Sequence, residues 1–293
     1  MKTESILDKP QKQLNPSVWN VVNEQYTLTD EAKSKIENVI NWVKENTQLN
    51  EIGLNITGSI TSNQYSTDSD IDLHFNSPEL TEESANEFNK ELRDKFISEF
   101  GPSENGYIGS HKIEIYFQYN VFQDMMSVGC YDYFNQEWIV GPELFPDGYD
   151  PYSEYYNDDM KYVNSIIYDI RNIILEVYES LVVINSSSND DFKTHELKHL
   201  SKLLDKGTNI FISATKFRQI YSSPKSKEEA LRKRTSRKWK IADSAFKLLD
   251  KFGYLAILKE ISTANDLLKT DENPYNILTN ILNTIQSSFN KSI

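Results

Sequence analysis

The chain has 293 residues, of which 38% are hydrophobic, and a formal net charge of −13 at pH 7. This length suffices for one large domain or two modest ones. The acidic balance argues against a protein that binds nucleic acid over its whole surface, because such surfaces are usually basic. Since Cys130 is the only cysteine, an internal disulfide is excluded, which favours a reducing compartment.

Targeting and membrane segments are not predicted. The first residues are polar and do not resemble a signal peptide. No apolar run approaches the roughly 20 residues that a membrane helix needs. The sequence therefore predicts a cytoplasmic protein without a membrane partner.

The N-terminal part begins with residues 1–26, which contain two prolines and few periodic apolar residues, and which we expect to form an arm. The apolar spacing i, i+3, i+4, i+7 then predicts an amphipathic helix over 29–45. Alternating apolar residues predict strands over 52–57, 70–75 and 113–118. The Ser77-Pro78 pair is expected to open a helix between the last two of these strands.

The segment from 113 to 160 contains no Lys or Arg, but ten acidic and thirteen aromatic residues. Gly and Pro interrupt it often, so we expect many loops. The aromatic side chains of 116–156 could stack on a base, but packing in a core is the favoured interpretation.

Beyond Met160 the apolar spacing is helical throughout, with further helices expected near 194–217, 227–252, 254–270 and 275–290. The predicted fold class is α+β, with a mixed sheet and flanking helices in residues 27–155. An all-α helical bundle is expected in residues 156–293.

Chemistry is concentrated between Gly58 and Leu73, which read GSITSNQYSTDSDIDL. Asp70 and Asp72 are two positions apart on an expected strand, so their side chains share one face. Two adjacent carboxylates repel each other unless a cation lies between them, and Mg²⁺ suits oxygen ligands beside phosphates. The Gly58-Ser59 turn offers N–H groups and a hydroxyl to a phosphate chain.

This stretch resembles the signature of the nucleotidyltransferase superfamily typified by DNA polymerase β, with spacing closest to the minimal bacterial and aminoglycoside types. The family pattern is Gly-Ser, three residues, Gly, five residues and Ser-Asp-hydrophobic-Asp. The matching positions are Gly58, Ser59, Ser69, Asp70, Ile71 and Asp72. Asn63 replaces the second glycine; asparagine is one of the few residues that tolerate a positive φ.

The resemblance implies a nucleotidyltransferase-like sheet and transfer of a nucleoside monophosphate from a nucleoside triphosphate, with ATP as the expected donor, releasing pyrophosphate. It implies that Asp70 and Asp72 hold Mg²⁺ or Mn²⁺. It also implies a third carboxylate near the acceptor. We assign that role to Glu114, on the polar face of the third strand, with Asp124 as the reserve candidate.

The resemblance further implies that Gly58, Ser59, Asn63 and Ser69 surround the nucleotide. The acceptor stays open between a small molecule, an RNA 3′ end and a protein hydroxyl. The segment 225–240 has eight basic residues and two acidic ones. It is either a contact surface for phosphate or RNA, or a solvated helix face paired with the acidic segment 124–159.

Two other functions are weighed against the transferase. A protein that retains the fold could bind nucleotide without catalysis or act as a scaffold. His195 and His199 fit the H-E-x-x-H spacing of zinc peptidases, although no third ligand is evident in the sequence. His74 and His111, which flank the acidic motif, are interpreted as structural residues.

Overall fold

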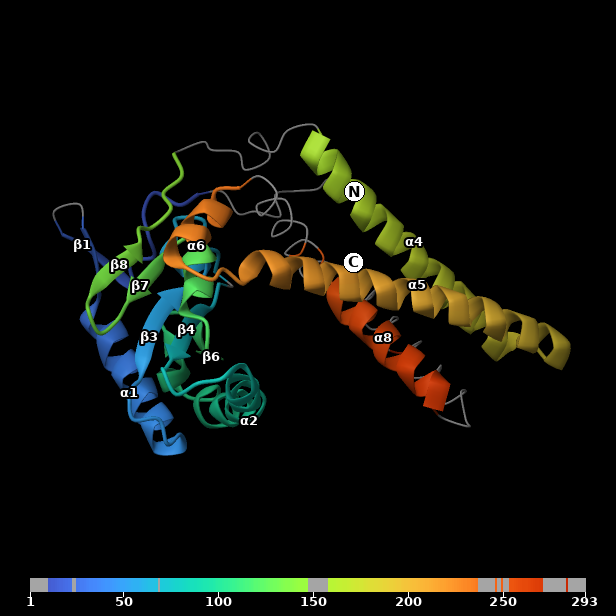
Figure 1. Cartoon of the computed structure of the whole chain (residues 1–293), viewed down its shortest axis with the longest axis horizontal. Helices are drawn as coiled ribbons and strands as arrows, with labels where there is room; N and C mark the ends of the chain where they lie inside the picture. Colours follow the sequence, from blue (N-terminus) through green and yellow to red (C-terminus); the bar gives the residue numbers. More distant parts are fainter. Residues whose placement is uncertain are drawn as a thin grey trace. The chain divides into compact units, whose positions relative to one another are not determined.

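The computed structural model describes residues 10–22, 25–67, 69–146, 158–236 and 253–270, with the single positions 246, 249 and 283. The chain divides into two compact units (Figure 1). Unit 1 comprises residues 1–153 and 222–235, and unit 2 comprises residues 154–221 and 236–293. Unit 1 contains a mixed sheet with helices, and the described part of unit 2 is helical. The expected α+β class is confirmed at this level.

The sheet of unit 1 has six strands in the order β5-β6-β4-β3-β7-β8. Its strands are β3 (Gly53–Thr57), β4 (Ile71–Asn76), β5 (Tyr107–Ile108), β6 (His111–Gln118), β7 (Cys130–Asp132) and β8 (Glu137–Val140). Strands β4 and β6 are parallel, and the other neighbours are antiparallel. The three predicted strands are confirmed as β3, β4 and β6. β7 and β8 are too short to give a recognisable alternation, so they could not be predicted from the sequence.

Alternation in β4 and β6 separates an apolar face from a polar one. The apolar face packs in one core with α1 (Asp30–Asn46) and α2 (Glu82–Phe100). This core includes Ile71, Leu73 and Phe75 of β4 and Ile113, Ile115 and Phe117 of β6, all at most 2% exposed. The helix predicted over 29–45 is therefore confirmed, and the opposite face of the sheet is left to polar side chains.

Helix α2 begins later than predicted and borders β6. Its N-cap is Thr81, which forms a capping box with Ser84, whereas Ser77-Pro78 lies in the preceding turn. Strand β5 pairs with only the first two residues of β6. Further along β6, the Asn89 side chain of α2 bonds both the N–H and the C=O of Phe117 at 2.8 Å. The helix thus satisfies a strand edge that would otherwise be unpaired.

The predicted N-terminal arm differs from the structure. Leu14, Val18 and Trp19 are at most 2% exposed and belong to the core of unit 1. Strands β1 (Trp19–Val22) and β2 (Gln25–Leu28) form an antiparallel hairpin. The Trp19 indole N–H donates to the carbonyl of Ile60 at 2.9 Å. Residues 10–22 and 25–26 are therefore part of the sheet-containing unit, and residues 1–9, 23 and 24 lie outside the described part.

The predicted boundary at 155/156 also needs correction, because residues 222–235 return to unit 1. Helix α6 (Lys227–Arg234) packs on the 3₁₀ segment η3 (Val121–Met126). The Asn120 side chain donates to the carbonyl of Pro224 at 3.0 Å. The helix expected over 227–252 accordingly ends at Arg234, and residues 237–245 are outside the described part.

Unit 2 contains α4 (Asp158–Ser186), α5 (Asp190–Ser222) and α8 (Tyr254–Thr270), which share a second apolar core. Helix α5 continues through Gly207, where an added Cβ would lie 2.9 Å from Ile261 Cγ2 of α8. The glycine therefore permits close helix packing. The helix expected over 275–290 lies outside the described part. Within that part, no helix has the length and apolar character needed to span a membrane.

Candidate active site

Three polar side chains lie in a row across the polar face of the sheet. Thr57 of β3 pairs with Asp72 of β4, and Asp72 pairs with Glu114 of β6. Side chains at paired positions share a face and lie roughly 5 Å apart. The strand pairing thus brings Asp72 and Glu114, predicted for the same site, next to each other.

Gly58 places the Gly-Ser turn directly against Asp72. Its φ of 81° and ψ of −171° belong to a region that is essentially restricted to glycine. An added Cβ at Gly58 would lie 2.1 Å from Asp72 Oδ2. The turn and the acidic motif, twelve residues apart in the sequence, therefore meet at the polar face.

The electrostatic surroundings of Asp72 are those of a crowded carboxylate. Burial raises its pKa above the usual value, and the charges of Glu114 and Asp70 raise it further. His74 and Arg93 act in the opposite direction. A divalent cation would remove the repulsion among these carboxylates and favour their charged form.

The Gly58-Ser59 turn is held by bonds within the protein. The N–H of Gly58 donates to Ser127 Oγ at 3.0 Å, and its carbonyl accepts from Thr61 Oγ1 at 2.6 Å. Ser59 Oγ, which is exposed, donates to Ser69 Oγ at 2.9 Å. The turn is thus preformed. The sequence predicts a Gly58 N–H that is open to phosphate, but in the structure the Ser127 hydroxyl accepts its hydrogen bond.

Asn63 acts here as an anchor for two chain segments. Its side chain donates to the carbonyls of Gln11 and Phe145 and accepts from the N–H of Phe145, each at 2.8 Å. Its φ is not positive, since Gln136 is the one described non-glycine residue with a positive φ. Asparagine therefore stands at this position for its hydrogen bonds, not for the left-handed conformation that the sequence analysis considered.

His111 fixes the chain just before Asp70. Its Nδ1 lies 2.7 Å from the carbonyl of Ser69, and its Nε2 lies 2.6 Å from Asn15 Nδ2. His111 is 4% exposed. The structural interpretation of this histidine is confirmed, and its role is to hold Ser69 and Asp70 at the start of β4.

Glu114 has partners that the sequence did not reveal. Arg93 Nη2 lies 3.2 Å from Oε2, and Lys112 Nζ lies 3.1 Å from Oε1. The Tyr116 hydroxyl donates to Oε2 at 2.7 Å. Although burial raises the pKa of Glu114, the hydrogen bonds from Tyr116 and Lys112 outweigh it and hold the pKa below its usual value. Both carboxylate oxygens are thus already paired with cations.

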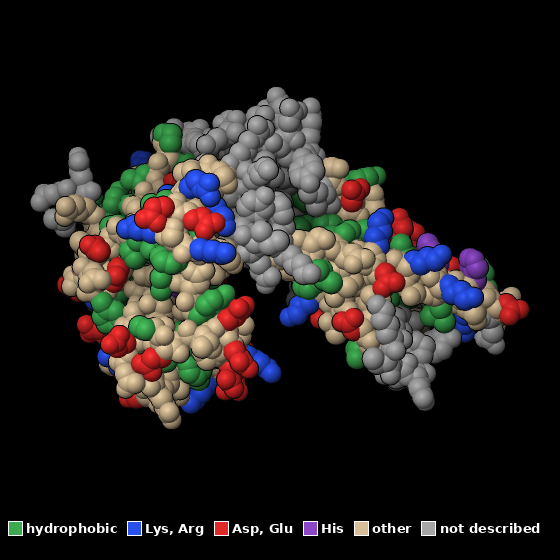
Figure 2. Space-filling view, viewed as in Figure 1, with side chains coloured by type: hydrophobic (Ala, Val, Ile, Leu, Met, Phe, Trp, Pro, Cys, Tyr) green, Lys and Arg blue, Asp and Glu red, His purple; other side chains and the backbone are tan. Residues whose placement is uncertain are grey.

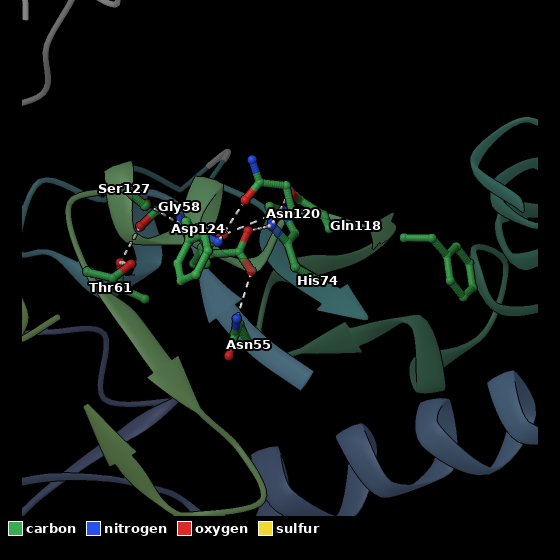
Figure 3. Close-up of polar contacts among 12 residues, drawn as sticks. Asn55, Gly58, Thr61, His74, Gln118, Asn120, Asp124 and Ser127 are labelled. Atoms are coloured by element: carbon green, nitrogen blue, oxygen red, sulfur yellow. Dashed lines mark hydrogen bonds and ion pairs between the residues drawn. The ribbon is translucent and has the colours of Figure 1, made fainter. Parts of the chain in front are cut away.

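Asp124, the reserve candidate, comes from η3 and packs onto the polar-face residues Asn55 and His74, where it is buried (Figure 3). Its side chain is fully buried, with Oδ1 2.6 Å from His74 Nδ1. Its Oδ2 accepts from Asn55 Nδ2 at 2.7 Å. Asp124 therefore orients His74, two residues beyond Asp72 on the same face of β4, and both of its oxygens are satisfied within the protein.

The fit of a divalent metal differs among the predicted ligands. Asp70 and Asp72 offer the oxygens that Mg²⁺ or Mn²⁺ prefers, and their charges act on each other. Glu114 and Asp124 do not fit as they stand, because their oxygens are used by cations or amides. Among the described residues, no group of three or more His, Cys, Asp or Glu side chains is arranged to hold a metal ion.

His195 and His199 lie one turn apart on α5 and are both exposed. Figure 2 shows histidine side chains, in purple, at the surface of unit 2. Glu196, between them, accepts a hydrogen bond from Ser180 Oγ at 2.7 Å. Within the part of unit 2 that is described, no third acidic, histidine or cysteine ligand joins this pair.

In the described part of the basic segment, Arg234 binds backbone and side-chain groups of unit 1. Arg234 Nε donates to the carbonyl of Ser127, and Nη2 donates to the carbonyl of Val128, both at 2.8 Å. Nη2 also lies 3.5 Å from Glu143 Oε2, an ion pair with the acidic segment. Figure 2 shows acidic and basic side chains interspersed where α6 lies. For Arg234 the pairing interpretation is confirmed; an RNA contact by 237–240 stays a prediction.

Arg234 and Ser127 form a support for the Gly58-Ser59 turn that could not be predicted from the sequence. Arg234 holds the backbone of Ser127, and Ser127 Oγ holds the N–H of Gly58. These residues are separated by more than 60 positions from one another. The cluster of basic residues at 225–240 is the only sequence feature that marks Arg234, and it does not indicate which groups Arg234 binds.

The variant Arg234→Gln is expected to loosen this support. Losing two charge-assisted bonds to partly buried carbonyls costs about 1.5–3 kcal/mol. The peptide spanning Gly58 should then exchange its amide hydrogens roughly tenfold faster in hydrogen–deuterium exchange.

Arg232→Gln provides the matched control, since Arg232 is exposed on the same helix and should leave the exchange unchanged. Equal protection at Gly58 in Arg234→Gln and the native protein would contradict the support role.

No family model, curated protein or solved structure matches the chain. The resemblance to the nucleotidyltransferase superfamily therefore rests on the motif residues between Gly58 and Asp72 alone.

Proposed function

We propose that the chain is a metal-dependent nucleotidyltransferase that moves a nucleoside monophosphate from a nucleoside triphosphate to an acceptor hydroxyl. This proposal rests mainly on the close approach of the Gly58 turn to the Asp72 carboxylate. A glycine turn beside a crowded carboxylate pair suits a metal–triphosphate complex.

The residues have distinct roles in this proposal. Asp70 and Asp72 hold the divalent cation, which when bound neutralises charge on the phosphates. The exposed Ser59 hydroxyl and the turn around it contact the outer phosphates, and ATP is the expected donor. Gly58 keeps the turn close to Asp72, because a side chain at this position would occupy the space of the carboxylate.

The reaction forms a bond between the acceptor oxygen and the α-phosphorus. The bond from that phosphorus to the bridging oxygen breaks, pyrophosphate leaves, and the proton of the acceptor hydroxyl passes to water. Glu114 is not given to the metal in this proposal, because Arg93 and Lys112 each face one of its oxygens.

The test uses α-³²P-labelled forms of the four nucleoside triphosphates with a lysate of the host. The double variant Asp70→Asn/Asp72→Asn should lose label transfer by at least ~10²-fold, in line with the loss of one electrostatic stabilising group or more. Asp94→Asn is the control, because Asp94 is exposed on α2 and should label like the native chain. Labelling by the double variant at the native rate would overturn the proposal.

A nucleotide-binding protein without transferase activity is the second candidate. It is favoured by two observations: the N–H of Gly58 is engaged by Ser127, and Glu114 is engaged by two cations. Calorimetry with ATP and Mg²⁺, followed by an assay for pyrophosphate, separates the two functions. Binding without pyrophosphate in the presence of lysate would favour this candidate.

A further inference from the structure

The polar face of β6 carries a small cluster of charged side chains. Arg93 of α2 and Lys112 of β6 converge on the single carboxylate of Glu114, at 3.2 and 3.1 Å. Two cations thus contact one carboxylate, and Asp72, which pairs with Glu114 on the neighbouring strand, balances the remaining positive charge. The cations remain accessible, with side chains 34% and 32% exposed, whereas Glu114 is 19% exposed.

Arg93 is held in a fixed orientation. Its guanidinium carbon lies 4.2 Å from the centre of the Tyr116 ring, and Nη2 donates to the Tyr116 hydroxyl at 3.1 Å. Such stacking fixes the plane of the guanidinium. Its contacts with the described residues involve Nη2, and a guanidinium carries five N–H donors. Arg93 is therefore an oriented group that can donate to a further anion.

The strand order determines what this cluster can contact. Strand β4, with Asp72, lies between β3 and β6. The Gly58 turn follows β3, on one side of Asp72, and Glu114 of β6, with Arg93 and Lys112 around it, is on the other side. If the triphosphate lies over the Gly58 turn, the cluster faces the other reactant.

We propose that Arg93 and Lys112, gathered by Glu114, form an anion-binding subsite that takes a phosphate or carboxylate of the acceptor. That the bound molecule is the acceptor rests on the proposed function. Anion binding by Arg93 and Lys112 does not depend on catalysis. A phosphate is the better match, because a planar guanidinium and a nearby ammonium complement its oxygens. A polycationic amino sugar is disfavoured in contact with Arg93 and Lys112, because these cations would repel its ammonium groups.

Binding is measured first with inorganic phosphate and with ribose 5-phosphate, by calorimetry on the full chain without nucleotide. Arg93→Gln and Lys112→Gln should each weaken ribose 5-phosphate binding by about tenfold, and ribose should not bind detectably. Lys95→Gln is the charge-matched control on α2, since Lys95 contacts Asn46 and Glu99 instead, and it should bind like the native chain. Thermal melts show whether each variant is folded. If Arg93→Gln is not folded, Arg93→Lys replaces it, because lysine keeps the positive charge but lacks the planar guanidinium.

Further arms identify the acceptor. A short single-stranded RNA with a free 3′ hydroxyl that competes with ribose 5-phosphate would make RNA the source of the phosphate, and no competition would point to a small phosphorylated compound. Competition by an aminoglycoside would overturn the inference. So would phosphate binding that is undetectable or unchanged in both Arg93→Gln and Lys112→Gln.

The two proposals can fail separately. Asp72→Asn removes a negative charge next to the cluster, so it should keep or strengthen ribose 5-phosphate binding while abolishing label transfer. Intact transfer in Asp70→Asn/Asp72→Asn together with phosphate binding that follows Arg93 would refute the transferase and leave the subsite. Lost transfer in Asp70→Asn/Asp72→Asn, together with phosphate binding that is independent of Arg93 and Lys112, would refute the subsite and leave the transferase.

Discussion

Replacing Gly58 by alanine is expected to abolish nucleotidyl transfer and to destabilise unit 1. Alanine at φ 81° and ψ −171° is strained by about 1–3 kcal/mol. Its Cβ would also lie 2.1 Å from Asp72 Oδ2, so either the turn or the Asp72 side chain must move. Each movement separates the turn from the carboxylate that the proposed function places beside it.

Two measurements distinguish strain from lost function. Urea unfolding followed by tryptophan fluorescence reports on unit 1, which contains Trp19, Trp42 and Trp138. Gly141→Ala is the control, since an added Cβ at Gly141 meets no atom within 4 Å, and it should retain stability and transfer. Native activity and stability in Gly58→Ala would show that the turn does not depend on glycine, and the contact with Asp72 would lose its significance.

The central part of this fold could be predicted because its residues obey local rules. Strands β4 and β6 alternate strictly, and α1 has a continuous apolar stripe, so each element follows from its own sequence. The pairing of Asp72 with Glu114 could be anticipated only as a shared polar face. Their exact alignment depends on the parallel register of β4 and β6, which no local pattern specifies.

Other features depend on contacts between distant segments. Residues 10–28 lack a clear period because Leu14 and Trp19 are buried by neighbours in the sheet unit and not by their own element. The return of α6 to unit 1 depends on Arg234 and Pro224 contacting residues more than 100 positions away. Composition identified the basic segment, but the carbonyls that Arg234 binds have no sequence signature.

The same reasoning explains why site residues were predicted unevenly. Asp70, Asp72, Gly58 and Ser59 form a motif of fixed spacing, which is visible in a single sequence. Glu114 was placed on the correct strand and face, yet its partners come from α2 and from its own strand, at positions with no distinctive pattern. Polar residues that stabilise a site are as scattered in sequence as any tertiary contact, so they become visible only when the fold is known.

The variant Asp124→Asn is expected to lower the free energy of unfolding by about 3 kcal/mol. Asp124 is the fully buried partner of His74, whose side chain is 16% exposed. Removing one charge of a buried pair leaves the other uncompensated, which typically costs 3–5 kcal/mol. The lower end applies because His74 retains some contact with water. Urea unfolding at pH 6 should show the loss, whereas Asp94→Asn, at an exposed position on α2, should not.

The loss in free energy of unfolding depends on pH through the charge of His74. The measurement is made in buffer with a chelator, so that no metal intervenes. Burial alone would lower the pKa of His74, but the carboxylates of Asp124 and Asp72 outweigh it and raise the pKa above its usual value. The Tyr116 ring also contacts the imidazole. A raised pKa in the folded state gives stability that is complete below about pH 6.5, the value of an unfolded histidine, and that disappears as the pH rises through the folded pKa. The difference between native protein and Asp124→Asn should therefore be largest at low pH and shrink toward alkaline pH. A difference that stays constant from pH 5.5 to 9 would mean that His74 does not carry a charge for Asp124 to balance, and that the pair is held by packing and the Asn55 hydrogen bond alone.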